Sequence, residues 1–241
     1  MKLGIQLYSL RKESQKDFIA VLEHVADCGY DGVEFAGYYG HSPKELKEHL
    51  DRLGLVCCST HTGWEDVFGH PEETVALHQT LGCSHVIVPW YTLSSAADVH
   101  ELAKKFNQVQ PIYADHGMTL GYHNHSQEFQ KDNGKYWLEI LAEEAPGIEL
   151  ELDTFWSTNG GADTRKFLLD YSSRISLIHL KDGNENGLQS IGEGDIDIQM
   201  ILNTAKEIDA KWAIVENDDP KPDGFTDSKK SMDNLKSKFT F

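Results

Sequence analysis

Long apolar runs and paired cysteines are both missing from this sequence. No segment approaches the roughly 18 consecutive apolar residues of a membrane span, and the first segment, MKLGIQLYSL, is too short and polar for a signal peptide. The four cysteines form no CxxC pair, which favours buried, reduced thiols over a disulfide framework (Cys28, Cys57, Cys58 and Cys83). We therefore expect a cytoplasmic protein that does not enter a membrane.

Positive charge is also scarce. The chain has 22 Lys and Arg residues against 39 Asp and Glu residues, a formal net charge of −17, and no basic run is longer than a pair such as Lys229 and Lys230. Proteins that bind nucleic acids usually present a basic face to the phosphates, so we expect no nucleic-acid partner. The acidic excess is instead typical of a surface that keeps a protein soluble.

Strand-like and helix-like patterns alternate along the whole chain. We expect strands at residues 3–8, 31–35, 55–60, 85–89, 118–124, 148–153, 175–180 and 211–216. We expect the main helices at residues 14–28, 43–53, 71–82, 96–116, 135–144, 164–171, 196–208 and 226–238. Eight units of about 30 residues predict a single-domain (β/α)8 TIM barrel over residues 1–241. The alternative, an open doubly wound sheet, is typically marked by a Gly-rich first turn, and no such turn follows the first strand.

Four residues with ligand-capable side chains lie at or near the ends of the last four expected strands: His123, Asp153, His179 and Glu216. In a parallel barrel these strand ends converge on the face that carries the active site. Two imidazoles and two carboxylates make a suitable divalent-metal site. A network of histidine–carboxylate pairs without a metal is the competing interpretation.

Alternation within the late strands supports this site. In the segment IELELD, Leu150 and Leu152 point one way, while Glu149, Glu151 and Asp153 point the other. Apolar residues suit the side that faces the helices, which leaves the carboxylates inside the barrel or at its mouth. Buried charge there needs a partner, and a cation is the natural one.

Seven segments of the chain resemble the xylose isomerase-like barrels of the sugar phosphate isomerases/epimerases. They are GYDGVEF, CCSTHTG, GYHNHSQEF, LELDTFW, ISLIHLKDG, SIGEGDIDI and AIVEND. Each segment is short, but their order and spacing cover essentially the whole chain. Relatives in this superfamily include ketose 3-epimerases, hydroxypyruvate isomerases, inosose dehydratases and the type-four endonucleases.

The resemblance implies one divalent ion, most often manganese, with magnesium, cobalt or zinc as alternatives. Asp153, His179 and Glu216 match the family's ligands after strands six, seven and eight. At the end of strand five the epimerases place a glutamate that is both ligand and acid–base group, whereas this chain has His123. Glu128 is the other candidate ligand on that side.

Two further departures from the family pattern concern the residues around the site. Trp156 stands in DTFW where epimerases and endonucleases carry a histidine, and no HxDxH-like segment follows strand seven, which argues against endonuclease chemistry. The stretch HLKDGNENG also lacks the arginine that ketose epimerases place near the substrate. Lys181 is the residue that can take a comparable polar role.

The chemistry that suits such a site is proton transfer beside a carbonyl, through an enediolate. We assign catalytic roles to Glu216 as base, with Glu128 and His61 as the other acid–base candidates. The predicted function is a sugar or sugar phosphate isomerase or epimerase. An inosose or keto-sugar dehydratase and a non-catalytic sugar-binding barrel remain open, as does a homo-oligomer.

A carbohydrate substrate also needs polar and flat apolar contacts at the mouth of the barrel. Aromatic rings can pack against the C–H faces of a sugar, and His61 can hydrogen-bond a hydroxyl or act as an acid. We expect substrate contacts, or contacts to the residues that surround the substrate, from Tyr8, Glu34, His61, Trp64, Trp90, His125, Trp156 and Lys181.

Overall fold

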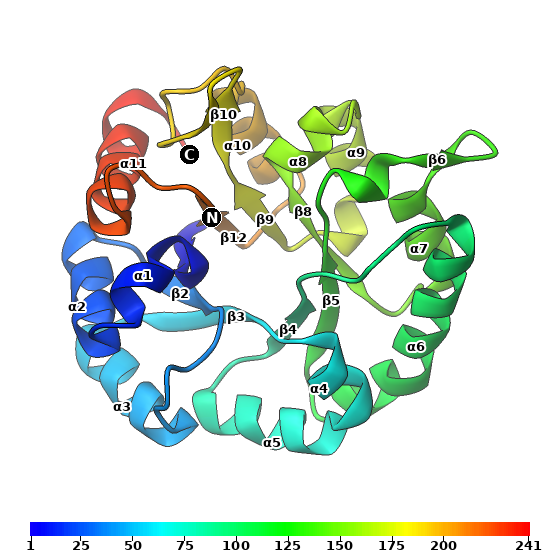
Figure 1. Ribbon diagram of the computed structural model, residues 1–241, viewed down its shortest axis with the longest axis horizontal. Coiled ribbons are helices and arrows are strands. Elements are labelled where there is room, and N and C mark those ends of the chain that lie inside the picture. Colours follow the sequence, from blue (N-terminus) through cyan, green and yellow to red (C-terminus); the bar gives the residue numbers. More distant parts are fainter.

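The computed structural model describes all 241 residues and confirms the predicted TIM barrel. Eight parallel strands close on themselves in the order β1-β12-β9-β8-β5-β4-β3-β2, and the helices surround them (Figure 1). The barrel strands are β1 (Lys2–Gln6), β2 (Gly32–Phe35), β3 (Val56–His61), β4 (His85–Val88), β5 (Thr119–His123), β8 (Glu149–Asp153), β9 (Leu177–Leu180) and β12 (Trp212–Val215). Each of them lies within one residue of an expected strand segment or inside it.

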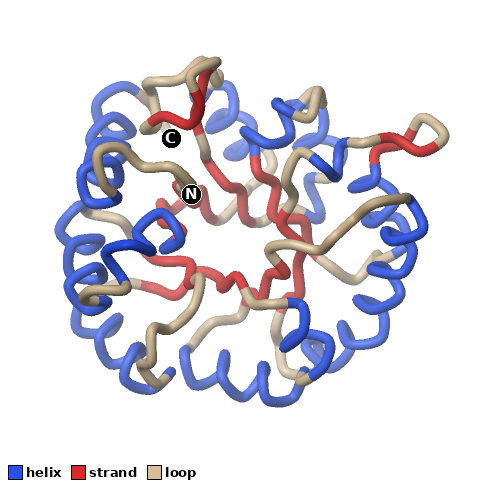
Figure 2. The backbone as a smooth tube through the Cα atoms, in the orientation of Figure 1, coloured by secondary structure: helices blue, strands red, loops and turns tan.

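The outer layer consists of helices that follow the strands along the chain (Figure 2). They are α1 (Arg11–Ser14), α2 (Phe18–Cys28), α3 (Pro43–Leu53), α4 (Trp64–Gly69), α5 (Pro71–Leu81), α6 (Ala96–Asp115), α7 (Trp137–Glu144), α8 (Thr154–Asn159), α9 (Thr164–Asp170), α10 (Ile198–Glu207) and α11 (Gly224–Lys238). Helix α3 shows why the boundaries were predictable. The Ser42 side chain accepts a hydrogen bond from the Glu45 N–H at its start, and Gly54 ends it with a φ of 71°.

Several short elements at the mouth were not expected. Strand β1 ends at Gln6, two residues earlier than expected, and a 3-10 helix follows at Leu7–Leu10. The Gln6 side chain accepts the Tyr8 N–H at 2.9 Å, which starts this turn. Two hairpins, β6–β7 (Lys131–Asp132 with Lys135–Tyr136) and β10–β11 (Asp182–Asn184 with Gly187–Gln189), and helices α4 and α8 were also missed. Their segments are too short for periodicity to identify.

The interior of the barrel holds a small apolar cluster and, toward the strand ends, polar side chains. A small cluster made of Cys58, Ile87, Leu177, Trp212 and Ile214 lies separate from the main core between strands and helices. Gly32 admits the indole of this cluster, because a Cβ built there would lie 2.9 Å from the Trp212 ring and 2.5 Å from the Val56 carbonyl oxygen. The interior positions near the strand ends hold charged and polar side chains, which form the site described below.

No helix is both long and apolar enough to span a lipid bilayer. All four cysteines are unpaired, and Cys57, Cys58 and Cys83 are buried, as expected from their spacing.

Candidate active site at the mouth of the barrel

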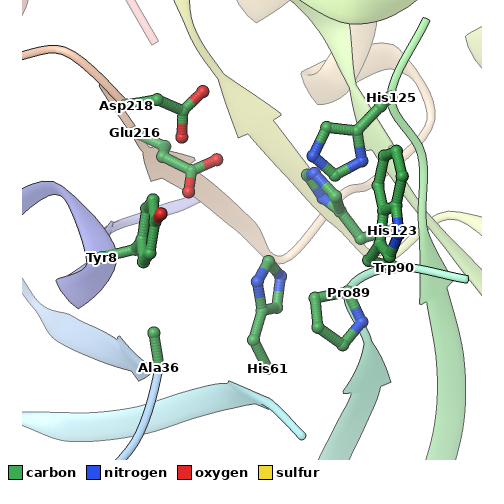
Figure 3. Close-up of a pocket in the computed structure, with 9 residues that line it drawn as sticks. All are labelled: Tyr8, Ala36, His61, Pro89, Trp90, His123, His125, Glu216 and Asp218. Atoms are coloured by element: carbon green, nitrogen blue, oxygen red, sulfur yellow. The ribbon is translucent and has the colours of Figure 1, made fainter. Parts of the chain in front are cut away.

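A pocket of about 480 Å³ opens at the carboxyl ends of the strands. Figure 3 shows side chains from several strand ends converging on it, with the Glu216 carboxylate on one side and Trp90 on the other. The lining residues are Tyr8, Ala36, His61, Pro89, Trp90, His123, His125, Glu216 and Asp218. This is the face on which barrel enzymes carry their catalytic groups.

The structure brings together the four predicted ligand residues at one end of this pocket. His123, Asp153, His179 and Glu216 are all buried, and each offers one ligand atom within 4.8 Å of the others. The strand register pairs Asp153 directly with His179, and His179 Nδ1 lies 2.9 Å from Glu216 Oε2. His123 Nε2 lies 3.9 Å from Asp153 Oδ2.

The orphaned atoms of this group fit a bound cation. Asp153 Oδ1 accepts the Trp156 N–H at the start of α8, whereas the buried Oδ2 has no hydrogen-bond partner although Lys181 Nζ lies 3.1 Å away. His123 is neutral at ordinary pH, because burial, and then the charge of His179, lower its pKa well below the usual value. A neutral imidazole and a free carboxylate oxygen are the donors that manganese or zinc takes.

A second set of polar side chains lies deeper in the barrel and contacts the first through its histidines. Glu151 Oε2 lies within 3.3 Å of three imidazole nitrogens, those of His61, His123 and His179. Glu34 Oε2 lies 2.7 Å from His179 Nε2 and accepts the Gln6 amide at 2.6 Å. A carboxylate on the far nitrogen of a ligand histidine sets the orientation of the ring and the position of its proton.

Glu151 was not among the site residues expected from the sequence, although the alternation in IELELD placed it on the interior face. Burial would raise the pKa of its carboxyl, but the neighbouring histidines, His179 first, hold that pKa well below its usual range. Burial opposes charge on His179 as well, and the carboxylates of Glu151, Glu34 and Glu216 nevertheless raise its pKa well above the usual value. His179 therefore links the deeper carboxylates Glu34 and Glu151 to the ligand group.

Lys181 is a buried cation beside the pocket, with 1 % of its surface exposed. Its Nζ lies 3.1 Å from Asp153 Oδ2, 2.9 Å from Glu216 Oε2 and 2.9 Å from Asp218 Oδ2. It also lies 5.2 Å from the centre of the Trp156 ring. Asp218 lines the pocket and was missed as a site residue, although it is the last residue of the AIVEND segment at the end of β12.

A tight turn anchors the segment that carries Lys181. The next residue, Asp182, accepts hydrogen bonds from the N–H groups of Gly183, Gly192, Gly194 and Ile196 at 2.8–3.2 Å. A Cβ on Gly194 would lie 2.1 Å from Asp182 Oδ1, so this approach requires glycine. The motifs HLKDG and SIGEGDIDI thus form one structural unit.

Glu128 does not reach the pocket. Its buried carboxylate accepts hydrogen bonds from the Tyr122 hydroxyl at 2.6 Å and from the His125 N–H at 2.8 Å. It therefore holds the loop after β5 and positions His125 at the pocket. Burial, followed by the charge of Lys181, lowers the pKa of His125 to about 4.

The aromatic side chains expected at the mouth divide into two groups. Trp90 and Tyr8 line the pocket and are 45 % and 44 % exposed, and Trp90 packs edge-on against the ring of His125. Trp64 packs against Tyr91 outside the lining. Trp156 lies beside Lys181 and, like Trp64, does not line the pocket. Glu34, the other residue expected there, also lies outside the lining.

Comparisons with known proteins agree with this architecture. The model of the xylose isomerase-like TIM barrel family matches residues 22–238. The chain is 23 % identical to an inosose dehydratase of Histophilus somni, covering 84 % of this chain and 83 % of that protein, and 24 % identical to one of Geobacillus kaustophilus, covering 81 % and 78 %. A sugar phosphate isomerase/epimerase structure from Parabacteroides distasonis superposes with a TM-score of 0.84 at 26 % identity, covering 98 % of this chain and 94 % of that one.

Proposed function

Because the chain belongs to the xylose isomerase-like TIM barrel family, we propose that it is a metal-dependent isomerase or epimerase of a small neutral sugar or cyclitol. The observation that carries this proposal is the convergence of two histidines and two carboxylates at one end of a pocket of sugar size. The isomerase/epimerase from Parabacteroides distasonis supports the reaction class.

His123, Asp153, His179 and Glu216 are the residues that would hold the metal. A divalent cation bound there would polarise a substrate carbonyl and acidify the neighbouring C–H and O–H groups. Glu34 and Glu151 orient the two imidazoles from below, through the contacts at His179 Nε2 and His123 Nδ1.

Glu216 is the general base in this proposal. Its Oε2 is engaged by His179 and Lys181 at 2.9 Å each, whereas Oε1 makes no hydrogen bond within the protein. Figure 3 shows this carboxylate directed toward the pocket. Burial alone would raise the pKa of Glu216, but the charge of Lys181, followed by that of His179, lowers this pKa well below its usual value and keeps the carboxylate ionised.

His61 is the acid–base group on the β3 side of the pocket. Its Nε2 contacts Glu151 at 2.8 Å, which leaves Nδ1 for a substrate hydroxyl. Burial lowers its pKa, but Glu34 and Glu151 raise it above the usual value overall, so it can donate a proton. With Glu216 as base and His61 as acid, a proton can be removed from one carbon of the substrate. Its return at a neighbouring carbon gives isomerisation, and its return from the opposite face gives epimerisation.

The charges around the pocket favour a substrate without phosphate. Glu216 and Asp218 present two carboxylates to it. Lys181 is saturated by three carboxylates, and Arg11 donates to the carbonyl oxygens of Tyr8 and Asp218. A phosphate group would therefore meet two carboxylates, while Lys181 is already paired with carboxylates.

A dehydratase is the second candidate, because the curated relatives at 23 % and 24 % identity are inosose dehydratases. Loss of a β-hydroxyl from the same deprotonated intermediate would need His61 as the acid that protonates the leaving oxygen. Isomerisation and dehydration thus share Glu216 and differ in the fate of the intermediate.

The test is a screen of neutral ketoses, inososes and ketose phosphates in D2O with added manganese, followed by NMR. Deuterium uptake with an intact carbon skeleton and no loss of water supports the isomerase or epimerase. Deuterium uptake with loss of water supports the dehydratase. Sugar binding with no exchange for any compound would contradict the proposal and indicate a binding protein.

A further inference from the structure

Lys181 occupies the carboxylate oxygens that the proposed metal site needs. Its ammonium contacts Asp153 Oδ2 and Glu216 Oε2, the same oxygens that face His123 Nε2 and His179 Nδ1 across the site. A divalent ion among these four residues would share both oxygens with a positive charge that the chain itself supplies. Two cations a few ångströms apart in a buried site repel each other strongly.

The structure also contains a third partner for this ammonium, outside the ligand group. Asp218 Oδ2 accepts a hydrogen bond from Lys181 Nζ at 2.9 Å, and 31 % of the Asp218 side chain is exposed at the pocket. Arg11 holds the backbone of Asp218 in place through its carbonyl oxygen, at 2.8 Å. A small rotation of the lysine stem would move the ammonium away from the ligand oxygens while it keeps its hydrogen bond to Asp218.

We propose that Lys181 is a tethered cation that competes with the divalent ion for Asp153 and Glu216, and that Asp218 receives the ammonium when the ion binds. This inference rests on the metal site of the proposed function. The Lys181–Asp218 pair would then control metal affinity. The ammonium of Lys181 would also neutralise the buried carboxylates of Asp153 and Glu216 in the metal-free protein. A direct contact between Lys181 and substrate would leave metal affinity unchanged, so the two roles can be separated.

The first experiment uses calorimetry to measure the manganese affinity of the 241-residue chain after its metal has been removed. Lys181→Met keeps the length of the side chain and removes its charge, and we expect the dissociation constant to fall by about tenfold or more. Lys229→Met is the matched control, because it removes the same charge from an exposed ion pair with Asp233 on α11, and its dissociation constant should equal that of the wild type. Equal affinities of wild type and Lys181→Met would overturn the inference.

Thermal unfolding of the same proteins gives an independent readout. In chelator, Lys181→Met leaves Asp153 without its ammonium partner and Glu216 with His179 alone, so its Tm should lie below that of the wild type. Manganese should raise the Tm of the variant by more than it raises the Tm of the wild type. An equal rise in both proteins would contradict competition for the two carboxylates.

Asp218→Asn tests the receiving position without touching the buried lysine. If Asp218 acts by accepting the ammonium, this change weakens manganese binding by about threefold or more in the wild type and has a smaller effect in the Lys181→Met background. An identical effect in both backgrounds would show that Asp218 acts on the ion directly and would overturn its assigned role.

The outcome for the proposed function is distinct. If neither the wild type nor Lys181→Met binds manganese, the metal site itself is wrong, and the inference fails with it. If only Lys181→Met binds the ion, the competition is supported in its extreme form, and the wild type then uses the lysine in place of a metal. If both bind with the same affinity, the metal site stands and only the inference fails.

Discussion

Glu216→Gln separates the role of this carboxylate as base from its role in holding the site together. Gln has the same shape as Glu but cannot accept a proton from carbon at neutral pH. Loss of a general base costs about a hundredfold or more in turnover, equivalent to about 2.7 kcal/mol in the barrier. We therefore expect kcat to fall by at least about a hundredfold.

The expected cost in stability follows from the contacts of Glu216. Breaking a buried ion pair typically costs about 3–5 kcal/mol when the remaining charge has no other partner. Lys181 keeps Asp153 and Asp218, and His179 keeps Glu34 and Glu151. The variant should therefore remain folded, with a loss in unfolding free energy below about 3 kcal/mol, measurable by denaturant titration.

The assay is solvent deuterium exchange into the best substrate of the screen, with circular dichroism to confirm the fold. Glu128→Gln is the control, because Glu128 is also buried but its carboxylate contacts Tyr122 and the His125 N–H instead of the pocket. It should retain most of the turnover. If Glu216→Gln keeps wild-type exchange and Glu128→Gln loses it, the base assignment is refuted and the strand-five carboxylate takes its place.

Three other predictions follow from the site and its surroundings. Purified protein dialysed against manganese should carry about one divalent ion per chain in elemental analysis. Asp153→Ala and His179→Ala should each abolish this binding, while the circular dichroism spectrum stays largely unchanged. Wild-type metal content in either variant would show that the substituted residue is not a ligand. The family resemblance places His123 where epimerases use a second glutamate, so 3-epimerisation of free fructose should be weak or undetectable by chromatography. His123→Glu should not simply improve the native reaction. Efficient conversion of fructose to psicose would show that the role assigned to His123 at the end of strand five is wrong. Gly194→Ala should destabilise the fold by about 3 kcal/mol, because the added Cβ would lie 2.1 Å from Asp182 Oδ1. Gly69→Ala is the control: a Cβ there has no neighbour within 4 Å, so its Tm should stay near that of the wild type.

The architecture was predictable because its determinants are local. Helix α3 begins after Ser42 and ends before Gly54, and both signals are side-chain and backbone preferences of single residues. Repetition of strand and helix patterns then allows few topologies for a chain of this length. The convergence of His123 and Asp153 on one face also follows from parallel order alone, because every strand of a closed parallel barrel ends on the same side.

The pairing of charges within the site was decided by tertiary structure. Glu151 contacts three histidines from three strands, and Lys181 contacts three carboxylates, because closure and register bring their ends within 3.3 Å. Glu128 and His125 both follow strand five within a few residues, yet the Glu128 side chain contacts Tyr122 and the His125 side chain faces the pocket. The sequence by itself determined the barrel and the face that carries the site, because strand order and helix limits depend on near neighbours along the chain. Only the folded barrel decided which charges meet, since those distances depend on the curvature of a sheet that closes across residues far apart in sequence.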